Sequence, residues 1–187
     1  VDFNTGTVIV AGGTLLGSVV DMGLGGGTGR VSILTLSGSG LATLSNLLFN
    51  TTTGSINLNG GTLETNSIVN SYIESSARIR FNGGTLKARQ STPAFISSAN
   101  LLETLVQSGG AVIDTNGFDI TIAEPLLEDA GSPGGGITKN GAGLLTLSAP
   151  GTTTGPADVN AGGLGVKAGL NSWTPSSFTH SGDTSTV

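Results

Sequence analysis

The chain has 187 residues, of which 32 are Gly and none is Cys, and 10% are charged, whereas an ordinary soluble domain carries about 25% charged residues. Seven Lys and Arg against twelve Asp and Glu give a net charge of −5 without a basic cluster, which argues against nucleic acid as a partner. The lack of Cys excludes disulfides and thiolate metal sites, and no apolar run reaches the ~18 residues that a membrane helix needs.

Short segments in which apolar and small polar residues alternate follow one another along the chain, separated by Gly and Asn. Alternation with a period of two residues indicates β-strands. The clearest expected strands are, in chain order, 8–10, 31–36, 55–58, 77–81, 119–122 and 144–148. Two further segments, 99–106 and 125–129, have room for a turn or two of helix but are equally compatible with strands or turns. The expected fold class is therefore all-β.

A glycine pair recurs along the chain at regular intervals. It is found as Gly-Gly-Thr-Leu or a variant of it at 12–15, 60–63, 83–86, 109–112 and, more loosely, 162–164. The steps are about 24 residues or about twice that, and a fixed period of roughly 20–50 residues is typical of solenoids and arrays. We therefore predict a single parallel β-helix (β-solenoid) of about seven coils, with the glycine pairs at its corners because Gly readily adopts positive φ.

Four segments resemble a known repeat. Residues 134–148 and 159–166 are similar to the autotransporter-associated β-strand repeat, also called the passenger-associated transport repeat, and residues 81–88 and 109–123 match phrases typical of the large bacterial surface proteins that carry it. Together the segments span residues 81–166, roughly half the chain. The resemblance implies an extracellular, right-handed parallel β-helix of bacterial origin, usually a stalk or spacer that carries no chemistry of its own.

The two ends of the chain lack the usual features of leaders and caps. The first residues have no basic or apolar segment typical of a signal peptide, so we expect such a peptide to have been removed or to lie outside this sequence. Residues 1–170 are predicted to form the solenoid, and residues 171–187 a C-terminal tail that either caps its own coil or acts as an inter-subunit strand.

The open ends of a solenoid predict self-association. Each end carries a row of unpaired N–H and C=O groups, and natural solenoids cover these rows with caps, which neither end of this sequence shows. A head-to-tail contact that does not close on itself yields a filament. The sequence therefore predicts an extracellular fibre subunit whose partners are copies of itself. The candidate self-association residues are Val1, Phe3, Val8, Val10, Trp173 and Phe178.

Catalytic and metal sites are not expected. Carbohydrate-active β-helices need clustered carboxylates, or Ca²⁺ held by Asp together with a basic residue, and the sequence has no convincing cluster of this kind. Asp114 and Asp119 flank a predicted turn, where such side chains more often bond to backbone. We predict no enzymatic activity, no cofactor and no metal.

One group of basic residues remains as a candidate for binding an anionic glycan. Four basic side chains fall within twelve positions: Arg78, Arg80, Lys87 and Arg89. The alternative interpretation is a solvated face that keeps the solenoid soluble. The sequence thus leaves two alternatives to the fibre subunit: a stalk fragment of a large autotransporter-like adhesin, and a glycan-binding or carbohydrate-active β-helix module with extracellular polysaccharide as its partner.

Overall fold

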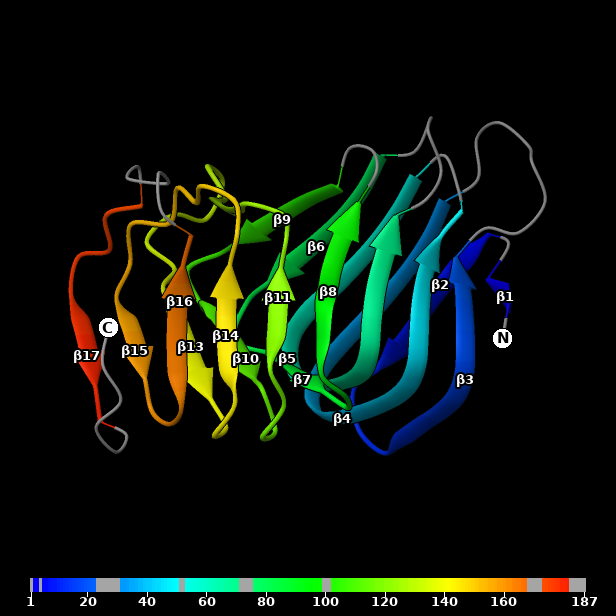
Figure 1. The fold of residues 1–187 in the computed structure, drawn as a ribbon. Helices are drawn as coiled ribbons and strands as arrows, with labels where there is room; N and C mark the ends of the chain where they lie inside the picture. Colours follow the sequence, from blue (N-terminus) through cyan, green and yellow to red (C-terminus); the bar gives the residue numbers. More distant parts are fainter. Residues whose placement is uncertain are drawn as a thin grey trace.

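The computed structural model describes residues 2–3, 5–22, 31–50, 53–70, 76–98, 102–167 and 173–181. The described elements are seventeen β-strands and no helix, and their pairings are parallel. Figure 1 shows the strands stacked along one axis as a β-solenoid of about seven turns. The prediction of an all-β parallel solenoid is therefore confirmed. From the N-terminus the chain passes down the rear of the view in Figure 1 and rises at the front, which is a right-handed winding.

Each complete coil has three sides, here called faces A, B and C in the order in which the chain passes through them. Face A contains β2 (Gly6–Val10), β6 (Ser76–Phe81), β9 (Leu102–Val106) and β12 (Leu126–Glu128). Face B contains β7 (Thr85–Ala88), β10 (Ala111–Asp114), β13 (Ile137–Asn140), β15 (Ala157–Val159) and β17 (Phe178–His180). Face C contains β1 (Asp2–Phe3), β8 (Thr92–Ser98), β11 (Ile120–Ile122), β14 (Leu144–Leu147) and β16 (Gly163–Val166).

Three long strands bend around corners and so belong to more than one face. β4 (Val31–Phe49) and β5 (Thr53–Asn70) run through all three faces, and β3 (Thr14–Met22) runs through faces B and C. The two segments that the sequence left open between helix and strand contain β9 and β12. Tertiary pairing decides these short segments, because each is hydrogen-bonded along the face A sheet.

The coil length varies around the predicted period. Thr53 lies opposite Ser76, 23 residues on, whereas Leu144 lies opposite Gly163, only 19 residues on. The glycine pair at 83–84 lies at the corner between faces A and B, as predicted, and Gly83 has φ +82°.

The glycine pair at 162–163 is not part of the same column, so this alignment was wrong. Gly162 has φ +66° and stacks on Ala142 and Gly143, which lie at the corner between faces B and C. The corresponding corner between faces A and B in the sixth coil is formed by Gly135 and Gly136. Glycine occurs at corners of both kinds, and a local sequence pattern does not distinguish them.

The core is a column of apolar side chains inside the coils. Inward residues alternate with outward ones along the strands, as in β6, where alternate positions are buried. The three largest side chains of the core, Phe49, Phe81 and Phe95, are fully buried. Each coil buries its apolar side only against its neighbours, so the stability of one coil depends on the next.

Candidate functional site

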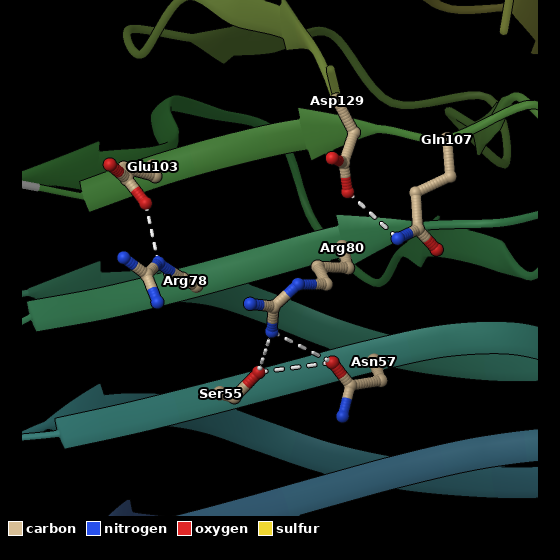
Figure 2. A network of polar contacts seen from close by, with 7 residues as sticks. All are labelled: Ser55, Asn57, Arg78, Arg80, Glu103, Gln107 and Asp129. Carbon is tan, nitrogen blue, oxygen red and sulfur yellow. Dashed lines mark hydrogen bonds and ion pairs between the residues drawn. The ribbon is translucent and has the colours of Figure 1, made fainter. Parts of the chain in front are cut away.

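The predicted basic group is divided between two faces of the solenoid. Arg78 and Arg80 lie on β6 and point in opposite directions along face A (Figure 2). The Arg78 Nε donates to Glu103 on β9, whereas the Arg80 Nη1 donates to Ser55 Oγ on β5 at 2.9 Å and to Asn57 Oδ1 at 3.4 Å. Both guanidinium groups therefore bind neighbouring coils of the same chain.

The other two basic residues follow the next corner. The turn at Gly83–Gly84 directs the chain from face A to face B, where Lys87 pairs with Glu64 at 3.0 Å. Glu64 also accepts a hydrogen bond from Thr43 Oγ1 at 3.2 Å, and Arg89 is exposed just beyond β7. The four residues therefore do not form one site, and three of them belong to ladders of polar side chains that link successive coils.

The predicted turn carboxylates form backbone contacts. Asp114 Oδ1 accepts the N–H of Asn116 at 2.7 Å, which stabilises a turn in which Asn116 has φ +53°. Asp119 Oδ1 accepts the N–H of Leu144 from the next coil at 2.8 Å. The first contact is the local one that the sequence predicted, and the second joins two coils.

The N-terminal candidates lie at one open end of the stack. Val8 and Val10 point inward from β2; Val10 is buried and Val8 partly buried. Phe3 belongs to β1, opposite Met22, and Val1 lies outside the described residues. Within the described part of the chain, β2 pairs only with β4, so its other edge is open.

Two outward residues of this first coil are large, apolar and exposed. Ile9 is 65% exposed and Leu16 is 70% exposed. Their register partners in the following coil are Thr35 and Thr43, which are polar. The sequence analysis did not single out these outward residues. The alternation places Ile9 outward between Val8 and Val10, whereas the phase of Leu16 depends on the corner that precedes β3.

The C-terminal candidates lie at the opposite end. Trp173 packs against the core and its Nε1 donates to Thr153 Oγ1 at 2.8 Å. Phe178 is 49% exposed although its partner Ala157 is fully buried, and Val166 is 43% exposed. Both residues occupy the inward phase of the last strands, so they are core positions that no further described coil covers.

Two carboxylates, Glu128 and Asp129, form hydrogen bonds that stabilise the connection from β12 on face A to β13 on face B in the sixth coil. The hydrogen bond from the Thr154 hydroxyl, together with the N–H of Gly134 at 2.9 Å, lowers the pKa of Glu128. The hydrogen bond from Gln107 Nε2 at 2.8 Å, together with the N–H of Gly131, lowers the pKa of Asp129. Both groups thus prefer the ionised form in the folded chain.

Acid is therefore expected to weaken this connection. A carboxyl whose pKa is lower in the folded chain stabilises the fold above its ordinary pKa of about 4, and this stabilisation is lost as the pH falls through the folded value. We expect the midpoint of thermal unfolding to fall between about pH 6 and pH 3, and to fall less in the double variant Glu128→Gln, Asp129→Asn. Equal slopes for the two proteins in calorimetry would contradict this assignment.

The structure also contains a buried cation that the sequence analysis did not identify. Lys139 on β13 is fully buried, and its Nζ donates to Gly141 O at 2.6 Å, Ala161 O at 2.8 Å, Asn140 O at 3.1 Å and Thr115 Oγ1 at 3.2 Å. Burial lowers the pKa of its ammonium group. The acceptors come from three successive coils, so the lysine ties together the corner between faces B and C.

A search of the described residues finds no group of three or more His, Asp or Glu side chains that could hold a metal ion. In the same part of the chain no helix is long and apolar enough to cross a membrane. No family model, curated protein or solved structure matches the chain. The resemblance to autotransporter-associated repeats therefore stays a prediction.

Proposed function

We propose that the chain is an extracellular structural protein, a β-solenoid subunit that assembles head-to-tail into a bacterial surface fibre. One observation carries the proposal: both ends of the described stack leave parallel strand edges open, and at the C-terminal end the inward residues Val166 and Phe178 remain half exposed. Open edges are templates for pairing with another chain. A contact of the two unlike ends generates a filament because it does not close by rotation.

The surface ladders support a structural role rather than a chemical one. The polar side chains of faces A and B bond from coil to coil, as in the pairs Arg78–Glu103 and Lys87–Glu64. Such contacts stiffen a rod and occupy the groups that a ligand would use. The extracellular location rests on the resemblance to the surface-protein repeat.

The fibre is tested by measuring assembly as a function of concentration. Sedimentation velocity and negative-stain microscopy of the purified chain are expected to show rods that lengthen with concentration. Monodisperse monomers at every concentration would overturn the proposal.

A charge at the end of the core is expected to stop elongation. In Phe178→Lys an ammonium group replaces an apolar ring that the next copy would cover, so we expect the critical concentration for assembly to rise by at least about tenfold. The monomer is expected to lose less than about 1 kcal/mol, because Phe178 is half exposed. The matched control is Leu144→Lys, which changes an outward residue that is 42% exposed on β14, a strand paired on both sides, with β11 and β16, within the same chain. Equal assembly of the two variants would contradict an end-to-end contact.

A spacer within a much longer surface protein is the second candidate, since the same open edges would then pair with further coils of one chain. The intact mass of the native protein distinguishes the two. A glycan-binding module receives less support, because the four basic residues lie on separate faces and three of them bond to neighbouring coils.

A further inference from the structure

We infer that a second copy of the chain continues the spiral of the first, with its β1 on β16 and its β3 on β17 of the preceding copy. The inference rests on the proposed function and specifies which strands meet and in which register. It follows from three observations: the order of the faces, the columns of residues, and the charges at the two ends.

The strands at the two ends of the described stack lie on successive faces of the spiral. The chain passes through faces A, B and C in turn, and the last described strand, β17, lies on face B. The next position of the spiral is on face C, on top of β16, whose outer edge is open among the described strands. At the other end, β1 lies on face C and leaves the edges of β2 and of the first half of β3 open. A second copy therefore supplies its strands in the order that the spiral requires.

The column of residues on face B fixes the register. A continuous column of paired residues leads from Thr14 on β3 through β4, β5, β7, β10, β13 and β15 to Thr179 on β17. Continuation of the spiral places Thr14 of the second copy directly opposite Thr179 of the first. Both residues are exposed, and the spacing of neighbouring strands sets their Cα atoms about 4.8 Å apart.

The joint between copies brings opposite charges together in the column on face C. Asp2 lies opposite Asp21 at the N-terminal end of this column. At the C-terminal end, Lys167 follows β16 and its N–H donates to Leu147 O at 3.0 Å, which places it in the same column as Asp2. The joint therefore brings an acidic end of the column onto an exposed basic residue, a complementarity that favours this orientation.

Engineered disulfides test the register, because the chain has no Cys of its own. The double variant Thr14→Cys, Thr179→Cys is expected to form covalent ladders of oligomers under mild oxidation, since its Cα spacing fits a disulfide. The control Thr7→Cys, Thr179→Cys places one thiol on face A and the other on face B, and is expected to form few of them. Each single variant has one thiol per chain and so can form no covalent species larger than a dimer. Assembly into rods with equal cross-linking of both double variants would overturn this register while leaving the fibre intact.

Charge reversal tests the column on face C. Lys167→Glu is expected to raise the critical concentration roughly fivefold at low salt, and Asp2→Lys added to it is expected to restore assembly. If the double variant does not recover assembly while the wild-type chain still forms rods, the result contradicts this joint but not the proposed fibre. A wild-type chain that stays monomeric at every concentration contradicts both the joint and the proposed fibre.

Discussion

Replacement of Gly135 by Ala is expected to lower the free energy of unfolding by about 3 kcal/mol or more. A Cβ atom at this position would lie 1.9 Å from the carbonyl oxygen of Gln107 and 2.9 Å from Val106 Cγ1, both in the preceding coil. The Gln107 backbone is itself held by a hydrogen bond to Phe81 O at 2.8 Å, so it cannot move aside cheaply. The alanine methyl group therefore forces two coils apart.

The matched control is Gly131→Ala, four residues away in the same connection. Its Cβ would approach no atom closer than Asp129 Oδ1 at 3.4 Å, and neither glycine has the positive φ that favours Gly. We expect Gly131→Ala to change stability by less than about 0.5 kcal/mol. Denaturant unfolding followed by circular dichroism measures both, and similar losses for the two variants would contradict the steric explanation.

These glycines show what a repeat pattern can and cannot predict. The sequence indicated the solenoid, its period and its glycine corners because alternation and recurrence are properties of the chain itself. It predicted glycine for its freedom to adopt positive φ, which holds at Gly83. The need for glycine at Gly135 has another cause, the close approach of the preceding coil, and that depends on a stacking register that no local pattern reveals.

The basic residues illustrate the same limit. Arg80 and Lys87 are close in sequence, but the corner at Gly83–Gly84 separates them onto different faces. Sequence spacing therefore overestimated their proximity. The partners that they do have, Ser55 and Glu64, lie one coil away along the axis.

The buried lysine was predictable in part. Ile137 and Lys139 are two residues apart in one strand, and Ile113 occupies the position opposite Lys139 in the preceding coil, so the alternation points the lysine inward. A charged residue at an inward-pointing position has two explanations. Either the strand is assigned in the wrong register, or buried polar groups of the fold bind the charge. The sequence could not choose between them, because the acceptors Gly141 O and Ala161 O come from corners of two different coils.

Replacement of Lys139 by Met is expected to lower the free energy of unfolding by about 3 kcal/mol. Methionine fills a similar volume but donates no hydrogen bond, so the carbonyl oxygens of Gly141 and Ala161 lose their buried donor. The matched control is Lys87→Met, which removes a lysine from a surface ion pair with Glu64 and is expected to cost less than about 1 kcal/mol.

The pH dependence of the stability difference between the wild-type chain and Lys139→Met separates the effect of the buried charge from the effect of side-chain packing. Burial lowers the pKa of Lys139 in the folded chain, so between that value and the ordinary lysine pKa of about 10.4 the unfolded chain binds more protons than the folded one. The stability of the wild-type chain relative to Lys139→Met should therefore rise as the pH rises through this window. Denaturant unfolding of both proteins at neutral and alkaline pH measures the difference. A constant difference would contradict the lowered pKa of Lys139, and a cost equal to that of Lys87→Met would show that the Lys139 side chain does not hold the corner together.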